Sequence, residues 1–517
     1  MNVPVIVDEL CDVLNLTPVT EDEVALAIKK LKSKKSTGHD GVPSYIFKGC
    51  AEHLLKPLTF VFNLAFKNKK YPEKFKMSAV CPVPKVSPVK NISDHRPICL
   101  VSSPGKLLES ILATRLLNHI RPVISDVQFG FLPQRSTVSN LINYTEDICK
   151  ALNNKCQLDS VYTDFRKAFD LVQFDVILLK LRQFGCSRAF IELMQTYLCN
   201  RLQYVYYGYH KSGTFTVVSG VPQGSSFGPL GFLIVINDLP KAVKSSRPLL
   251  FADDMKIYKE IRCVEDCREL QTDLQAITEW SIANKLPFNF DKCNVMTFTL
   301  LRDPIVFDYS MGTQVLQRTN LVKDLGVFFQ SNLSFDHHIA TKVNEAFKLV
   351  GFIKRTCKYF NNERSLLTVF NSFVLPKIEY CSIIWCPFFE VQKKQIENIQ
   401  KKFLKYIIRK LRNMDPTFMH YEDVLNLFEC KTLENRRAFA SVAYLHKLIH
   451  NREDNPAFLS RLSFNCTTRQ LRTHALFYAG HSRIDVVKYS PMNRILSVGN
   501  SLHEREIDFF QRQFNKN

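Results

Sequence analysis

The stretch that decides the fold is residues 249–258, Leu-Leu-Phe-Ala-Asp-Asp-Met-Lys-Ile-Tyr. Two acids, Asp253 and Asp254, stand between two apolar runs. The pattern predicts two strands joined by a two-residue turn, with both carboxylates at the bend. Adjacent carboxylates repel each other, so the arrangement favours a bound cation. Taken alone, the dipeptide is more simply explained as a polar turn, because Asp is a favoured turn residue.

A third acid, Asp164, directly follows another short apolar strand, Val-Tyr-Thr at 161–163. Two strand ends that present carboxylates are what a two-magnesium phosphoryl-transfer site requires. In such a site one ion lowers the pKa of an attacking 3′-hydroxyl, and the other neutralises charge on the leaving pyrophosphate. The three acids are therefore candidate ligands of a pair of magnesium ions.

A loop rich in glycine and proline lies between the two acidic strands, at 219–230 (Ser-Gly-Val-Pro-Gln-Gly-Ser-Ser-Phe-Gly-Pro-Leu). It leads into an apolar helix predicted over 230–239, which a proline ends. Gly220 and Gly224 allow backbone amides to come close to a ligand, and Gln223 can hydrogen-bond a sugar or base edge. An ordinary turn explains the loop alone. Its position between the acids makes a functional interpretation more specific.

In the order acid, glycine loop, acid pair, these segments resemble the palm motifs of reverse transcriptases. The resemblance is closer to non-LTR retrotransposons such as the jockey-like elements of insects. Other segments are similar to an extra N-terminal motif, two fingers motifs, the fourth palm motif and the primer-grip hairpin of that family. In chain order they are Thr-Gly-His-Asp-Gly-Val-Pro at 37–43, Asp-His-Arg-Pro-Ile-Cys-Leu at 94–100 with Lys-Leu-Leu-Glu at 106–109, Gln-Phe-Gly-Phe at 128–131 with Arg-Ser-Thr at 135–137, Trp280, Asn284, Leu286, Asn289 and Lys292, and Lys-Asp-Leu-Gly-Val at 323–327.

The resemblance implies a right-hand polymerase of the α+β class, with fingers, palm and thumb and an antiparallel palm sheet. Placing the motifs on the chain predicts a helical N-terminal extension (1–65), fingers and palm (66–330), a helical thumb (331–415) and a helical C-terminal region (416–517) of unassigned role. Helices are expected near 23–32, 54–67 and 335–352, and another is expected to begin at 433.

Metal ligation is the first role that the resemblance implies. Asp164 and Asp253 would be the principal ligands of two Mg²⁺ ions, for which Mn²⁺ can substitute. Asp254 would lie alongside, and the carbonyl of Phe165 would complete the shell. Phe169, five residues after Asp164, would be a steric gate, because a bulky ring there clashes with a ribose 2′-hydroxyl. Without the motif, Phe169 would be interpreted as a core aromatic.

Nucleotide binding is the second implied role. Gln223 and Gly224 would line the incoming nucleotide. Arg96 and Lys85 are candidates for the triphosphate, because arginine offers a planar fork and lysine a point charge. Lys292 would be the general acid that protonates pyrophosphate. For Arg96, Lys85 and Lys292, a plain surface position is the competing interpretation.

Charge agrees with a nucleic-acid partner. The 517 residues include 69 Lys and Arg against 49 Asp and Glu, a formal charge of +20, which favours binding to a polyanion. Basic residues gather at 393–412, where Ile396, Ile399, Phe403, Tyr406 and Ile407 recur at helical spacing. One face of this helix can pack while the other follows a phosphate backbone. An ordinary amphipathic surface helix is the alternative.

Several other classes of protein are disfavoured. The 16 cysteines contain no Cys-x-x-Cys pair, so a zinc knuckle is not expected, and their apolar settings indicate reduced thiols. The start lacks a basic signal-peptide region, and no apolar run approaches the roughly 20 residues of a membrane span. We therefore expect an intracellular protein of the cytoplasm, the nucleus or both. The lysines at 29–35 could be a nuclear signal, but they fit better as the end of a helix capped by Thr20.

The function expected from the resemblance is RNA-directed DNA synthesis, with an RNA template, a DNA primer and dNTPs as partners and no membrane. Jockey-like elements usually place an endonuclease ahead of the polymerase, and nothing before Asp40 offers its His, Asp and Asn residues. We expect such a nuclease to be supplied in trans. The chain could be a truncated copy, a fragment or a host-retained polymerase. A catalytically idle RNA-binding remnant and an RNA-templated RNA polymerase are the alternatives, and the bulk of Phe169 argues against the latter.

Overall fold

Two five-stranded sheets and the helices packed around them make up this computed structural model, which describes residues 13–465, 475–478, 480 and 482–503. It contains 52% helix and 15% strand, so the predicted α+β class is confirmed. The cysteines in the described ranges are free thiols. Within the same ranges, no helix is both long and apolar enough to cross a membrane.

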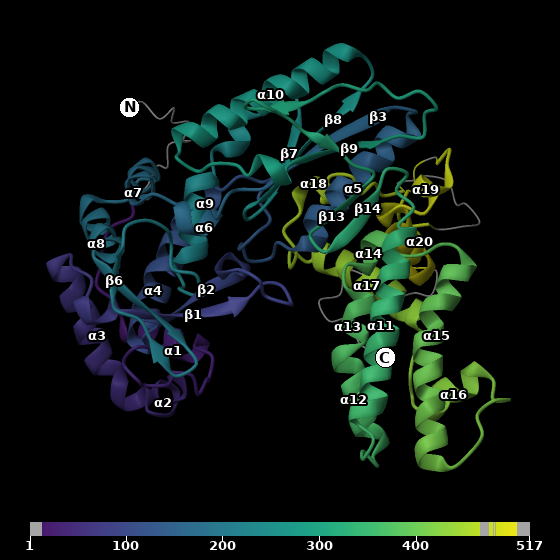
Figure 1. Cartoon of the computed structure of the whole chain (residues 1–517), viewed down its shortest axis with the longest axis horizontal. Helices are drawn as coiled ribbons and strands as arrows, with labels where there is room; N and C mark the ends of the chain where they lie inside the picture. Colours follow the sequence, from purple (N-terminus) through teal and green to yellow (C-terminus); the bar gives the residue numbers. More distant parts are fainter. Residues whose placement is uncertain (1–12, 466–474, 479, 481, 504–517) are drawn as a thin grey trace.

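The central sheet carries the predicted acids (Figure 1). Its strands, in spatial order, are β12 (Gln317–Arg318), β9 (Asn294–Phe298), β3 (Gln157–Thr163), β8 (Asp254–Ile261) and β7 (Arg247–Phe251). The middle strand β3 runs antiparallel to both neighbours, and only the short edge strand β12 pairs in parallel. Thr163 at the end of β3 lies opposite Met255 of β8. This register brings Asp164 to the same edge of the sheet as the β7–β8 turn.

The second sheet lies apart from the central sheet, beside α1, α3 and α4 (Figure 1). Its strands are β2 (His95–Val101), β1 (Ser78–Pro84), β4 (Arg201–Tyr207) and β5 (His210–Lys211), with β6 (Phe215–Val217) also paired to β4. Two small hairpins complete the strands: β10 (Ser310–Met311) with β11 (Gln314–Val315), and β13 (Leu321–Asp324) with β14 (Val327–Gln330).

The helices of the first half surround the sheets. They are α1 (Glu21–Lys30), α2 (Ser44–Gly49), α3 (Ala51–Asn68), α4 (Ser103–Ile120), α5 (Thr137–Asn153), α6 (Ala168–Leu171), α7 (Phe174–Gln183), α8 (Arg188–Leu198), α9 (Gly228–Ile236) and α10 (Val264–Ala283). The start of α1 is a capping box: the Thr20 hydroxyl accepts from the Glu23 amide, and the Glu23 carboxylate accepts from the Thr20 amide. Acids in its first turn and Lys29 and Lys30 in its last complement the helix dipole, as predicted.

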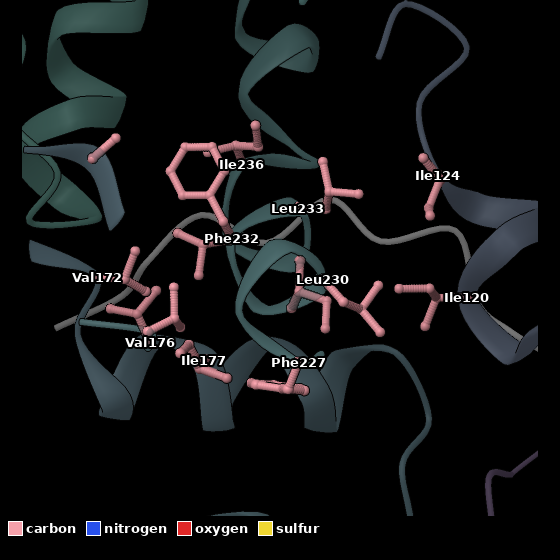
Figure 2. Packing of buried hydrophobic residues seen from close by; sticks show 14 of the residues in the cluster. Ile120, Ile124, Val172, Val176, Ile177, Phe227, Leu230, Phe232, Leu233 and Ile236 are labelled. Carbon is pink, nitrogen blue, oxygen red and sulfur yellow. The ribbon is translucent and has the colours of Figure 1, made fainter. Parts of the chain in front are cut away.

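Helix α9 is apolar on every side because it is buried on every side (Figure 2). Its side chains pack between Ile120 and Ile124 on one flank and Val176 and Ile177 of α7 on the other. The helix ends at Ile236, three residues before the predicted boundary, because a separate 3₁₀ turn begins shortly afterwards. The glycine-rich loop is therefore attached to one of the most rigid elements of the core.

The second half of the described chain is almost entirely helical. Its helices are α11 (Asp336–Thr356), α12 (Glu363–Phe373), α13 (Leu375–Glu379), α14 (Ser382–Trp385), α15 (Glu390–Ile407), α16 (Tyr421–Leu427), α17 (Leu433–Ile449), α18 (Pro456–Leu459), α19 (Asp485–Lys488) and α20 (Pro491–His503). Figure 1 shows α11, α12 and α15 extending together away from the central sheet. In contrast, α18, α19 and α20 fold back and pack against α5. The helices predicted at 23–32, 54–67, 335–352 and from 433 are all present, with boundaries shifted by a few residues.

Candidate active site

The turn between β7 and β8 differs by one residue from the prediction. Phe251 pairs with Asp254, so the two turn residues are Ala252 and Asp253, and Asp254 is the first residue of β8. Ala252 has a φ of 57°, a left-handed value that is usual at the first central position of a type II′ hairpin and is normally met by glycine. The prediction that both acids occupy the bend is therefore wrong for Asp254, although both remain at the same sheet edge.

The segment 128–130 explains why the turn adopts this conformation. The Oε1 atom of Gln128 accepts hydrogen bonds from the Ala252 amide (2.9 Å) and from the Gly130 amide (2.7 Å). The Phe129 amide donates to the Leu250 carbonyl at 2.9 Å. A Cβ at Gly130 would lie 2.3 Å from the Ala252 nitrogen, so only glycine fits there. From the sequence alone, Gln128 had no predicted role beyond its place in a motif.

Asp164 lies beside this turn. Its carbonyl accepts from the Asn289 amide at 2.7 Å, which fixes the backbone where β3 ends. Its Oδ2 atom is buried and has no hydrogen-bond partner. The Nζ of Lys292 lies 3.0 Å from that atom, in an ion pair without hydrogen-bond geometry. The next residue, Phe165, is buried and stacks on Phe288 with ring centroids 4.3 Å apart.

Desolvation and repulsion between carboxylates raise the pKa of Asp253 and of Asp254. Desolvation and the charge of Asp164 raise the pKa of Asp253, and the charges of Arg96 and Lys292 oppose the rise. For Asp254, desolvation and the charges of Asp253, Asp324 and Asp164 raise the pKa to about 6. Asp254 keeps an exposed surface, so part of this rise comes from the neighbouring carboxylates. A bound cation would relieve that repulsion.

The donor set suits a hard divalent cation. Carboxylate oxygens are the ligands that Mg²⁺ prefers, and the buried Oδ2 of Asp164 lacks a hydrogen bond. Over the described ranges, no three His, Cys, Asp or Glu side chains already form a metal-binding cluster. The ammonium group of Lys292 lies beside Asp164 at the place where a cation ligated by that carboxylate would bind.

Phe169 in α6 packs between two aromatic rings. It stacks on Phe232 of α9 with centroids 4.7 Å apart and meets Phe131 edge to face at 5.9 Å. The residue is only partly buried, so part of it remains accessible. Both interpretations of Phe169 thus fit its position, since one ring can belong to the core and still limit space above it.

The glycine-rich loop is held in place by Asp170 and by β2. Asp170 Oδ1 accepts from the Gln223 side-chain amide at 2.9 Å, and the Gln223 carbonyl accepts from the Cys99 amide at 2.7 Å. Gly224 has a φ of 112°, and a Cβ there would lie 2.9 Å from the Cys99 carbonyl oxygen. Asp170 was not among the predicted residues. It ties Gln223 to the segment that begins at Asp164.

The three predicted cations differ in position. Arg96 lies on β2, and Lys292 lies in the 3₁₀ turn Phe290–Lys292. Both positive charges lower the pKa of Asp253, so both lie within electrostatic reach of the acids. Lys85 follows β1, where its Nζ donates to the Ser93 carbonyl at 3.2 Å. The structure therefore brings Arg96 and Lys292 to the acids and places Lys85 on the β1–β2 hairpin.

Comparison with known proteins agrees with this arrangement. Residues 83–353 match the family model described as reverse transcriptase (RNA-dependent DNA polymerase), which covers more than half of the chain. The chain belongs to the reverse transcriptase family.

Relatives of this family member include polymerases of insect mobile elements. The chain is 28% identical over 407 residues to the probable RNA-directed DNA polymerase from transposon X-element of Drosophila melanogaster, covering 76% of this chain and 44% of the relative. It is also 28% identical over 345 residues to the RNA-directed DNA polymerase from mobile element jockey of Drosophila funebris, covering 64% and 37%. The chain thus spans about two fifths of the length of these relatives. Reverse transcriptases generally depend on a divalent metal ion.

A buried ion pair lies next to the acids of this reverse transcriptase family member. Lys256 of β8 donates to Asp324 of β13, and its Nζ lies 4.5 Å from the centroid of the Tyr144 ring. A cavity of about 200 Å³ borders Asp324, Lys256, Asp254 and Asp164. The sequence did not identify this pair, because its two residues are 68 positions apart.

The basic helix α15 packs as its spacing predicts, and Ile396, Ile399, Phe403 and Ile407 are buried. The charges of α15 and of the π-helical turn Ile408–Arg412 that follows it are less free than the sequence suggests. Lys393 pairs with Glu390 and Glu434, Arg412 pairs with Glu363, and Lys410 donates to the carbonyls of Cys357 and Phe360. Part of the basic run therefore stabilises the helical region itself.

Proposed function

We propose that this chain is an RNA-directed DNA polymerase of a non-LTR retrotransposon, which adds dNTPs to a primer 3′-hydroxyl on an RNA template. The observation that carries the proposal is the meeting of Asp164 with the β7–β8 turn, where three carboxylates repel one another at one sheet edge. Membership of the reverse transcriptase family supports it.

Asp164, Asp253 and Asp254 are the proposed ligands of two Mg²⁺ ions, together with the Phe165 carbonyl. Bound there, the ions would lower the pKa of the 3′-hydroxyl and neutralise charge on pyrophosphate, and Mn²⁺ could take their place. Lys292 stands 3.0 Å from Asp164 and is the proposed general acid. Once released from Asp164, its ammonium group would move toward the leaving pyrophosphate and give up a proton to it.

The remaining residues select and hold the nucleotide. The ring of Phe169, fixed by Phe232 and Phe131, is the proposed gate against a 2′-hydroxyl. Gln223, oriented by its bond to Asp170, would contact the nucleotide, and the tight backbone at Gly224 would allow close approach. Arg96 is the proposed triphosphate contact near Asp253, and Lys85 a more distant one.

The proposed division of the chain follows the right-hand arrangement. Fingers and palm would occupy 66–330, after a helical extension over 1–65. The helices of 331–415 would form the thumb along the template–primer duplex, and 416–517 would follow as a further helical region. Cleavage of the target DNA would come from an endonuclease supplied in trans.

Incorporation of dNTPs on poly(rA)–oligo(dT) with Mg²⁺ tests the proposal. We expect wild type to extend the primer, and Asp253→Ala to lose at least about 10³-fold in rate, because a principal metal ligand is removed. Binding of the template–primer should remain. Asp303→Ala, which removes an exposed carboxylate elsewhere, is the matched control and should extend normally. No extension by wild type, with RNA still bound, would favour the catalytically idle remnant.

The nearest enzymatic rival is an RNA-templated RNA polymerase. It predicts incorporation of NTPs as readily as of dNTPs, whereas the gate at Phe169 predicts strong preference for dNTPs. The ratio of the two rates on the same template decides between them. Phe169→Val should bring the ratio toward one, since the smaller side chain leaves room for the 2′-hydroxyl.

A further inference from the structure

Arg135 connects the catalytic turn to a distant part of the chain. It precedes α5 and is nearly buried, with 8% of its side chain exposed. Its Nη1 atom donates to the carbonyl of Gln128 at 2.8 Å, and its Nε donates to Asp454 Oδ2, also at 2.8 Å. Asp454 belongs to the region after 416, for which the sequence suggests no role. One guanidinium therefore bridges that region to the residue that holds the turn.

The segment 451–455, which we call the C-terminal strut, makes further contacts to the same place. The Gln134 side chain donates to the Asn451 carbonyl at 3.0 Å, and the Asp454 amide donates to the Gln134 carbonyl at 2.6 Å. Glu453 accepts hydrogen bonds from the hydroxyls of Ser136 and Ser139.

The end of the strut is also anchored. Asn455 is 2% exposed, and its Oδ1 accepts from the Asn143 side chain of α5 at 2.9 Å. Buried, fully directed bonds of this kind fix one segment against another far more firmly than surface ion pairs do. The strut thus has a single defined position on the segment that contains Gln128 and Arg135.

The link continues from Arg135 to Asp253 without a gap. Arg135 holds the Gln128 carbonyl, the Gln128 side chain holds the Ala252 amide, and Asp253 is the next residue. Gln128 is 3% exposed and its Nε2 has no partner. An unsatisfied buried amide is costly, so the benefit of this side chain lies in the two bonds that its oxygen accepts.

We infer that the C-terminal strut positions Asp253, acting through Arg135 and Gln128. Asp454 and Arg135 are positioning residues, since neither touches the reacting atoms. The catalytic consequence rests on the proposed polymerase function, whereas the mechanical link does not. A charge-assisted bond at Asp454 is the step whose removal should loosen the turn most selectively.

Hydrogen exchange and kinetics of the full-length chain test the inference. Asp454→Ala removes the acceptor of the Arg135 Nε, while Arg135 keeps its contacts to Asp126 and to the Ser125 and Gln128 carbonyls. Glu23→Ala is the matched control, because it removes the carboxylate of another partly buried Arg pair, Arg115–Glu23, in the N-terminal region. In Asp454→Ala we expect amide exchange in the peptide 249–255 to rise at least about tenfold, because the Gln128 side chain that accepts from the Ala252 amide is held less firmly. We expect kcat for dNTP incorporation to fall about tenfold with the template–primer Kd unchanged. Glu23→Ala should change neither quantity.

Unchanged exchange at 249–255 would overturn the inference, and so would equal loss of kcat in Asp454→Ala and the control. If Asp454→Ala does not fold, Asp454→Asn decides, since it keeps one oxygen for Arg135 and should show a smaller local rise. Uniformly faster exchange across all peptides would assign the strut to overall stability alone and overturn the positioning role. Absence of dNTP incorporation by wild type would remove the proposed function, while the exchange result would still decide the link.

Discussion

Two buried lysine–aspartate pairs lie on different sides of the central sheet. Lys180 of α7 donates to Asp238, and the side chains are 2% and 10% exposed. Lys256 donates to Asp324, and the side chains are 4% and 7% exposed. In composition and burial the two pairs are nearly the same.

Their surroundings differ. The second oxygen of Asp238 accepts from the Trp280 indole at 3.1 Å, so the carboxylate has a partner on each side. Asp324 instead borders the cavity of about 200 Å³ and adds its charge to those that raise the pKa of Asp254. The Lys180–Asp238 pair is enclosed by α7, α10 and the end of α9. The Lys256–Asp324 pair faces the cavity that also borders Asp254 and Asp164.

The difference indicates where function lies in this fold. Around Asp238 every charge is balanced locally, so the pair can only stabilise. Around Asp324 four carboxylates share the nearby cations Lys256, Lys292 and Arg96, which leaves room for a further positive charge. Chemically identical pairs thus have different roles, and three measurements should separate them.

The largest effect on stability should follow the loss of Asp238. Asp238→Ala leaves the Lys180 ammonium and the Trp280 indole N–H buried without partners, and breaking a buried pair this way costs about 3–5 kcal/mol. Denaturant unfolding should show this loss, while kcat per folded molecule stays near wild type. A selective loss of kcat at unchanged stability would contradict the assignment of this pair to structure alone.

Loss of Lys256 should cost less stability and more activity. Lys256→Met leaves Asp324 uncompensated, but the adjoining cavity admits water, so we expect about 2–3 kcal/mol. Lys256 is also the cation that opposes the rise in the pKa of Asp254. Its removal should move the acid limb of the pH–rate profile to higher pH. An unmoved acid limb would show that the pair does not reach the acids.

These contrasts explain how far the sequence could be interpreted. Local patterns sufficed for the Thr20 cap, the β7–β8 hairpin and the strand that ends at Asp164, because capping, alternation and turn chemistry act between near neighbours. The observed turn lies one residue earlier than the predicted turn, because its position depends on Gln128, more than 120 residues away.

Site residues could be predicted only where they belong to a short sequence motif. Asp170 and the Lys256–Asp324 pair gain their roles from partners brought together by tertiary packing. The same reason explains the basic run at 393–412. Glu434 and Glu363 form ion pairs with Lys393 and Arg412, which the sequence suggested were free to bind nucleic acid. Long-range ion pairs have no sequence period that would reveal them.

The smallest effect should come from pH acting on Asp254. Its pKa rises from the ordinary 3.8 to about 6, so between these values the metal-free folded state binds more protons than the unfolded state. Stability without metal should therefore fall as pH rises from about 4 to about 6.

The same proton competes with a cation, so the Mg²⁺ concentration for half-maximal activity should rise about tenfold per pH unit below 6. Titration of Mg²⁺ at several pH values checks this, and Asp254→Asn should flatten the dependence because it has no proton to lose. A wild-type Mg²⁺ requirement that is constant from pH 7 to pH 5 would mean that Asp254 does not face the cation, and the contrast between the two buried pairs would lose its functional side.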